Sequence, residues 1–281
     1  MKITGKIVTL ILLIILFIGL CVLLYPAVSQ YWNSKVQSRA VIDYELSAGA
    51  VDPESYSEMF SAAFDYNEAL AELKNPLTDY NELGSCDGLL NSSGNGMMGY
   101  ITIEKLQVEL PVYHGTSADV LSKACGHLEG TSLPVGGKGT HAVLSAHRGL
   151  PNAKLFTNLD RLQLGDTFTI TILGEVLTYQ VDQIKIVSPD DVTYLKIDPD
   201  CDYCTLLTCT PYGINSHRLL VRGTRIESTA QKKLIITSEA YQIDRLIVTP
   251  AVAVPILFVL IVYVICRPVK KKIKYEDFAS K

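Results

Sequence analysis

Two long apolar segments constrain this 281-residue chain more than any other feature of its sequence. Residues 7–25 consist mainly of Ile, Leu, Val and Phe, and residues 246–266 contain no charged side chain. About 20 apolar residues in a helix suffice to cross the hydrocarbon core of a bilayer. Pro250 and Pro255 in the second segment are compatible with a membrane helix, where neighbouring groups satisfy the freed carbonyls. We therefore expect two transmembrane helices, within residues 1–26 and at residues 246–266.

Basic residues lie on the outer flank of both segments. Lys2 and Lys6 precede the first, and the tail 267–281 that follows the second is rich in lysine. Positively charged flanks resist translocation, so we predict a two-pass protein of the cell membrane with both termini in the cytoplasm. Residues 27–245 then lie outside the cytoplasm. A cleaved signal peptide is the alternative for the first segment, because the small residues at 27–29 loosely resemble a cleavage site.

The net charge of −4 combines basic chain ends with a more acidic middle. The middle offers no basic face, so we expect a membrane but no nucleic acid among the partners. Five of the seven cysteines lie outside the apolar segments, and an odd number there predicts at least one free thiol. Whether the other cysteines form disulfides is an open question. The five cysteines outside the apolar segments are Cys86, Cys125, Cys201, Cys204 and Cys209.

Residues 27–97 have the pattern of a helical region followed by a linker. Asp52 before Pro53 is typical of a helix start, with an N-cap followed by proline in the first turn. Asn75 before Pro76 predicts the end of the helix, because a residue that precedes proline avoids helical geometry. Apolar residues recur between these points at spacings of three and four, at Met59, Ala63, Tyr66, Leu70 and Leu73.

Residues 98–226 change to short runs of Ile, Val, Thr and Tyr separated by turn residues. This pattern predicts a mainly β domain, an antiparallel barrel or sandwich, followed by a spacer at residues 227–245. The predicted strands are residues 99–103, 108–113, 142–146, 167–173, 176–187, 203–208 and 218–226.

The last two predicted strands bring chemically useful side chains together. If they form a hairpin centred on Gly213 and Ile214, Cys209 lies directly opposite Arg218, on the same face of the sheet. Only a few per cent of an ordinary cysteine is thiolate at neutral pH, and a fixed guanidinium raises that fraction. The same guanidinium can donate hydrogen bonds to an oxyanion.

Release of an amine by a cysteine nucleophile also requires a proton donor, for which histidine suits neutral pH. Of the five histidines, His147 comes directly after the predicted strand 142–146 and before a turn. Taken alone, Cys209 also fits an inert buried thiol, and His147 a structural histidine.

Three motifs resemble those of the sortase family: LSAHRG at residues 144–149, TLLTCTP at 205–211 and NSHRLLV at 215–221. Two further segments, YHGT at 113–116 and GHLEGTSLP at 126–134, resemble the pilus-assembling class C. The resemblance implies an eight-stranded sortase β-barrel, with N-terminal helices and the two flanking transmembrane helices completing the fold.

In function, the resemblance implies a cysteine transpeptidase that cleaves an LPXTG-like signal between Thr and Gly. Cys209 is then the nucleophile, His147 the acid and base, and Arg218 the group that holds substrate or oxyanion. Thr208 is a further candidate for substrate binding. The implied substrates are pilin or surface proteins, and the implied acyl acceptor is a pilin lysine.

One segment departs from the class C pattern. Many pilus sortases carry an Asp-Pro-aromatic lid before the barrel, whereas residues 75–77 read Asn-Pro-Leu here. The existence of a lid therefore stays open. Two other functions also stay open: a cell-wall-anchoring sortase that uses a peptidoglycan amine, and a non-catalytic membrane-tethered binding module.

We expect neither a cofactor nor a metal. The remaining histidines show no zinc-site spacing on one face; they are His114, His127, His141 and His217.

Overall fold

The computed structural model describes residues 2–227 and 245–266. The predicted basic tail at 267–281 lies outside the described residues, as does nearly all of the predicted spacer at 227–245. The chain divides into two compact units, one formed by residues 1–28 and 238–281 and the other by residues 29–237. Each unit is described by itself.

Two helices carry the apolar segments. Helix α1 (Lys2–Gly49) contains the segment Ile7–Gly49, which is long and apolar enough to cross a membrane. Helix α5 (Arg245–Cys266) covers the second predicted span, but its described apolar part, Ala253–Tyr263, is shorter than a span. The expectation of two transmembrane helices is therefore supported for the first helix and only in part for the second.

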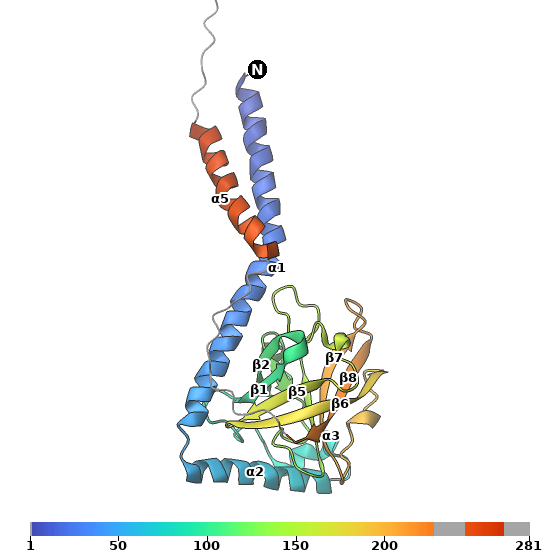
Figure 1. The fold of residues 1–281 in the computed structure, drawn as a ribbon. Coiled ribbons are helices and arrows are strands. Elements are labelled where there is room, and N and C mark those ends of the chain that lie inside the picture. The colour runs from blue at the N-terminus through green and yellow to red at the C-terminus, as the bar shows by residue number, and fades with distance from the viewer. Residues whose placement is uncertain (1, 228–244, 267–281) are drawn as a thin grey trace, which may run out of the picture. The chain divides into compact units, whose positions relative to one another are not determined.

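Eight strands form one closed barrel, in the order β1-β2-β3-β4-β7-β8-β6-β5 (Figure 1). The predicted eight-stranded barrel is confirmed. The strands are β1 (Met97–Ile103), β2 (Val108–His114), β3 (Cys125–His127), β4 (Thr140–Ser145), β5 (Thr167–Ile172), β6 (Glu175–Val187), β7 (Asp202–Thr210) and β8 (His217–Ile226).

The barrel differs from the sequence prediction in two respects. Strand β3 has only three residues and was not predicted, because so short a run shows no alternation. The pairs β2–β3 and β4–β7 are parallel, so the prediction of an antiparallel sheet is wrong at these two places. Parallel neighbours need a crossover connection rather than a tight turn, and turn residues in the sequence therefore do not reveal them.

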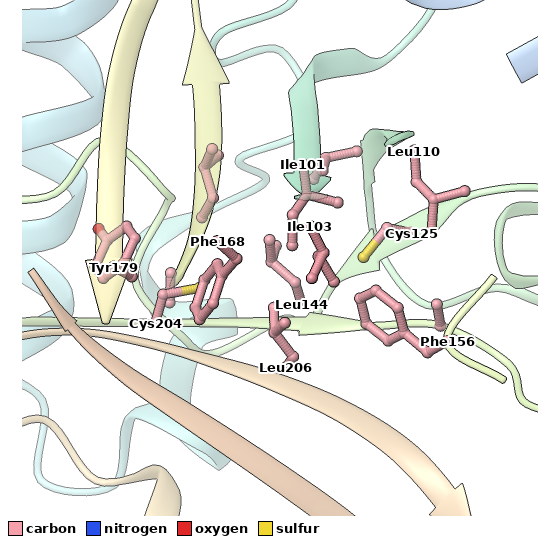
Figure 2. Packing of buried hydrophobic residues seen from close by; sticks show 14 of the residues in the cluster. Ile101, Ile103, Leu110, Cys125, Leu144, Phe156, Phe168, Tyr179, Cys204 and Leu206 are labelled. Carbon is pink, nitrogen blue, oxygen red and sulfur yellow. The ribbon is translucent and has the colours of Figure 1, made fainter. Parts of the chain in front are cut away.

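Apolar side chains from all around the barrel meet in its interior (Figure 2). Ile101 of β1, Leu144 of β4 and Leu206 of β7 are each fully buried there. Burial of such side chains stabilises the fold by about 25 cal/mol for each Å² of apolar surface removed from water. This is the main force that closes the barrel. Cys125 and Cys204 belong to the same interior cluster, and burial raises the pKa of both thiols.

Helical segments before the barrel pack on it through specific polar contacts. Helix α2 (Pro53–Glu72) begins as predicted, with the Asp52 carboxylate accepting from the amides of Glu54 and Ser55 at 3.1 and 3.0 Å. The Asn67 side chain exchanges two hydrogen bonds with the backbone of Leu133, at 3.1 and 2.7 Å. Figure 1 shows α2 lying along the barrel, and this buried amide fixes its register there.

Near its C-terminal end, α1 contacts the barrel through the buried hydroxyl of Tyr44. The Tyr44 hydroxyl donates to the Met98 carbonyl at 2.5 Å and accepts from the Leu173 amide at 2.8 Å. Burial raises the pKa of Tyr44 to about 12, so the group remains a donor at any ordinary pH. Short helices complete the unit: α3 (Pro76–Asp79), η1 (Tyr80–Leu83), η2 (Glu104–Leu106), α4 (Ala118–Leu121), η3 (Leu159–Arg161) and η4 (Thr193–Leu195).

Candidate active site

Strands β7 and β8 form the hairpin that the sequence predicts. Cys209 pairs directly with Arg218, and Thr210 pairs with His217 at the turn end. The turn places Gly213 at φ 77° and Asn215 at φ 60°, in the left-handed region that Gly and Asn tolerate best. The predicted opposition of Cys209 and Arg218 across the hairpin is confirmed.

The pleat of β7 sorts its side chains between the barrel interior and the outer face. Leu206 and Thr208 are buried, whereas Leu207 and Cys209 are partly exposed. Alternate residues of a strand point to opposite faces, so the Cys209 thiol lies on the outer face. Cys209 is thus partly exposed, whereas Cys204, five residues earlier, is fully buried.

Thr208 lies on the other face from the thiol. It is 1% exposed, and its hydroxyl donates to the carbonyl of Ala146 at 2.8 Å. The Ala146 amide in turn donates to the Leu207 carbonyl at 3.2 Å. Thr208 thus fastens the end of β4 to β7, and its side chain does not share the face of Cys209.

His147 follows the end of β4, the strand that pairs in parallel with β7. The pairing runs up to Ser145 opposite Leu207, and the Ala146 amide still donates to the Leu207 carbonyl at 3.2 Å. His147 is the next residue, where the chain leaves the sheet; it is half-buried, and its carbonyl accepts from the Phe156 amide at 3.2 Å. Strand β7 therefore has the strand of Arg218 on one side and the strand that leads to His147 on the other.

The guanidinium of Arg218 is oriented by the hairpin turn. Its Nη1 donates to the carbonyls of Asn215 at 3.3 Å and His217 at 3.1 Å. Across residues 2–227 and 245–266, no carboxylate forms an ion pair with Arg218. A guanidinium has five N–H donors in a planar fork, so donors remain for an incoming oxyanion.

The segment after His147 packs against the β7–β8 turn. Arg148 forms an ion pair with Asp160 at 2.6 Å, and its guanidinium carbon lies 5.9 Å from the centre of the Tyr212 ring. Gly149 has φ +78°, and a Cβ there would come within 2.9 Å of the Tyr212 ring. The sequence reasoning did not assign a role to Arg148, Asp160 or Tyr212, although Arg148 and Gly149 belong to the histidine motif.

A small apolar cluster, which we call the outer-face cluster, lies beside the thiol. Leu207 is two residues before Cys209 on the same face, and Leu220 is two residues after Arg218. Leu77 of α3, at the position of the questioned lid, packs against this cluster. Its buried members are Val143, Val187, Leu195 and Leu220, and its partly buried members are Leu77, Leu128, Tyr194 and Leu207.

The cysteines with described side chains are all free thiols, so none of the disulfides left open by the sequence is formed among them. They are Cys21, Cys86, Cys125, Cys201, Cys204 and Cys209. One histidine, His114, lies in a group of possible metal ligands. Its imidazole lies with Cys86 and Asp87, and their three ligand atoms are within 4.8 Å of one another.

This closed barrel, with Cys209 opposite Arg218 on adjacent strands, is that of the sortase domain, whose family model matches residues 101–226. Sortase C1 from Streptococcus agalactiae is 47% identical, with a TM-score of 0.64 over 68% of this chain and 99% of that one. Clostridium perfringens sortase C, solved with its C-terminal cell wall sorting motif, is also 47% identical, with a TM-score of 0.60 over 68% of this chain and all of that one.

A curated relative shows a more distant similarity. Sortase D of Bacillus subtilis (strain 168) is 30% identical over 131 residues, which are 46% of this chain and 63% of that protein. The chain thus covers less than two thirds of this relative's length. The chain belongs to the sortase family, a family of cysteine transpeptidases, and its structural neighbours are class C sortases.

Proposed function

We propose that this protein is a membrane-anchored transpeptidase that cleaves an LPXTG-like sorting signal between Thr and Gly and transfers the acyl group to a lysine amine of a pilin. The observation that carries the proposal is the direct pairing of Cys209 with Arg218 across the β7–β8 hairpin. The parallel β4–β7 pairing, which ends two residues before His147, supports His147 as the third group.

In the first half-reaction, the Cys209 thiolate attacks the Thr carbonyl carbon. The carbonyl oxygen becomes an oxyanion, to which the free N–H groups of Arg218 donate. The C–N bond to Gly then breaks, and protonated His147 gives its proton to the leaving amine. The products are a thioester on Cys209 and a free amino terminus on the Gly fragment.

In the second half-reaction, an uncharged lysine amine attacks the thioester carbonyl. Neutral His147 takes the proton that the amine loses, and the Cys209 thiolate leaves. An isopeptide bond joins the two proteins, and His147 is again protonated for the next cycle. Each group thus returns to its starting state without an external oxidant or reductant.

The outer-face cluster is suited to the apolar part of the signal. Leu207 and Leu220 flank Cys209 and Arg218 on the same face, and the β6–β7 connection adds Leu195 and Tyr194. Apolar side chains of a bound Leu-Pro pair would bury their surface there and point the Thr carbonyl toward the sulfur. The Clostridium perfringens sortase C structure with a cell wall sorting motif supports this class of substrate.

A two-pass topology fits this reaction. Helix α1 anchors the domain, and the basic residues beyond each apolar segment favour cytoplasmic termini. The catalytic domain then faces the cell surface, where its substrates are displayed. The resemblance to class C sortases, together with the second apolar segment, favours a pilin lysine over a peptidoglycan amine as acceptor.

Mass spectrometry of the full chain in detergent micelles tests the proposal. Incubation with an LPXTG-type peptide should add the acyl fragment to Cys209 as a thioester, which a lysine-bearing acceptor peptide then removes. Cys209→Ala should form no adduct, whereas the control Cys201→Ala, at a half-exposed thiol before β7, should form it as wild type does. A folded wild-type protein that forms no adduct would instead support a non-catalytic binding module.

A further inference from the structure

A second cluster of reactive side chains lies at the start of the barrel. Cys86 and Asp87 belong to the segment between η1 and β1, and His114 ends β2. The Cys86 sulfur is 3.9 Å from Nδ1 of His114, and all three ligand atoms lie within 4.8 Å of one another. None of these residues takes part in the reaction derived above.

The imidazole of His114 is held in the form that binds a metal. Its Nε2 is 2.7 Å from the carbonyl of Leu89. A carbonyl only accepts, so Nε2 carries the proton and Nδ1 presents a lone pair toward the sulfur. Burial lowers the pKa of His114, which favours the neutral ring. Metal-binding histidines typically donate their second N–H to such a carbonyl, which fixes tautomer and ring orientation.

The spacing of sulfur and nitrogen suits a tetrahedral ion. With a Zn–S bond of about 2.3 Å and a Zn–N bond of about 2.0 Å, a tetrahedral angle separates the two atoms by about 3.5 Å. The observed 3.9 Å requires a closure of only a few tenths of an ångström. The Asp87 carboxylate beside this pair accepts from the Ser85 hydroxyl at 2.8 Å through one oxygen, which leaves lone pairs for an ion.

The surroundings of Cys86 suit a bound cation. Burial raises the pKa of the Cys86 thiol, and the nearby carboxylates of Asp87 and Glu129 raise it further. The Tyr66 hydroxyl acts in the opposite direction, because it forms a hydrogen bond with the sulfur. A divalent cation would offset the negative charge gathered here and displace the thiol proton to solvent.

We propose that Cys86, Asp87 and His114 form a binding site for a single Zn²⁺ ion, with solvent in the fourth position. Thiolate and imidazole ligands select zinc over calcium or magnesium, which prefer oxygen. The ion joins the segment before β1 to the end of β2, because its ligands come from both. Binding follows the balance Zn²⁺ + Cys–SH → Zn–S–Cys + H⁺, with no change in oxidation state.

Cobalt titration of the full chain in micelles tests the ligand set, with Cys209→Ala as background so that the active-site thiol contributes nothing. One equivalent of Co²⁺ should produce a thiolate-to-cobalt charge-transfer band, which Zn²⁺ abolishes. Cys86→Ser should remove the band and weaken Zn²⁺ binding at least about tenfold in calorimetry. The control Cys201→Ser, at a half-exposed thiol outside the cluster, should leave both unchanged.

A second readout keeps the test decisive if Cys86→Ser folds poorly. Zn²⁺ should raise the Tm of the Cys209→Ala protein. In the same background, this increase should be smaller with Asp87→Asn, a substitution at an exposed residue, and absent with His114→Ala. No charge-transfer band at one equivalent of Co²⁺, a band retained in Cys86→Ser, or the same Tm increase in His114→Ala would each overturn the proposal.

Discussion

Cys204 and Cys209 lie on the same strand five residues apart, yet the structure gives them opposite surroundings. Cys204 faces the barrel interior with no exposed surface, and burial raises the pKa of its thiol well above the usual value. Cys209 faces outward, is partly exposed and lies opposite Arg218. Residues an odd number of positions apart on a strand point to opposite faces of the sheet. One thiol is therefore buried and inert, and the other is a candidate nucleophile.

Burial also separates the histidines, but not by the face of the sheet alone. His127 and His141 are buried at 1% and 0% exposure, each with a backbone carbonyl at a ring nitrogen. His141 alternates with Ala142 and Leu144 of the interior, so it lies on the outer face with Val143, where the chain around Lys196 covers it. His147 follows the last residues of β4, where the chain leaves the sheet, and is half-buried.

The largest expected effect separates the two cysteines. Cys209→Ala should lower transpeptidation at least about 10⁴-fold, with an unchanged Tm, because the nucleophile is lost and no core contact is removed. Cys204→Ala should lower the free energy of unfolding by about 1 kcal/mol through a small cavity, with turnover per folded molecule preserved. Turnover assays paired with thermal melts measure both. A folded Cys204→Ala protein without activity would break the comparison.

The next effect concerns the two arginines on the outer face of β8. Arg218→Lys should lower turnover by between about 10² and 10³, because a point-charge ammonium does not reproduce the planar fork. Arg222→Lys is the matched control, four residues further along. The Arg222 guanidinium binds Asp182 through two contacts at 3.1 and 2.6 Å, so its loss should affect stability by less than about 1 kcal/mol and turnover little. Equal losses in both variants would argue against a role for Arg218 at the sulfur.

The buried His127 is expected to make the folded protein less stable in acid. Burial lowers its pKa from the ordinary value of 6.5 to about 4, so the unfolded chain binds a proton more readily than the folded one. Stability should therefore fall as pH decreases from about 6.5 to about 4, by up to about 3 kcal/mol from this group.

Denaturant unfolding across that pH range measures the effect. His127→Gln removes the titrating ring, so its stability should depend less steeply on pH than that of wild type. The same slope in both proteins would show that other groups cause the acid loss.

The smallest effect concerns the segment over the outer-face cluster. Leu77→Ser should raise peptide turnover about fivefold, because it removes an apolar contact worth about 1 kcal/mol from the proposed substrate surface. Leu164→Ser, at a side chain that is 67% exposed near the start of β5, is the control and should change nothing. A rise well above tenfold would show that α3 blocks the site strongly even without an acidic and an aromatic residue.

Contacts could be predicted from the sequence where the contacting elements are close together along the chain. The β7–β8 register follows from a short Gly-containing turn, which leaves one way to pair Cys209 with Arg218. The Asp52 cap and the interior alternation of β7 are equally local.

Long-range juxtapositions were not predictable in the same way. The parallel β4–β7 pair, whose strands are separated by more than fifty residues, brings the strand that leads to His147 beside that of Cys209, and no local pattern predicts this pairing. Cys86 and His114 are 28 residues apart and meet only because the segment before β1 folds back against β2. The number of residues between two positions in the sequence does not show that they will come into contact in the fold.

The parallel pairing of β4 and β7 has a consequence for protein engineering. Interstrand hydrogen bonds hold the ends of these two strands, which lead to His147 and Cys209, side by side independently of the length of the intervening chain. The β6–β7 connection, which contains η4 and supplies Tyr194 and Leu195 to the apolar surface, is outside that pairing. We expect changes in the length and composition of this connection to alter the apolar surface while the β4–β7 pairing persists.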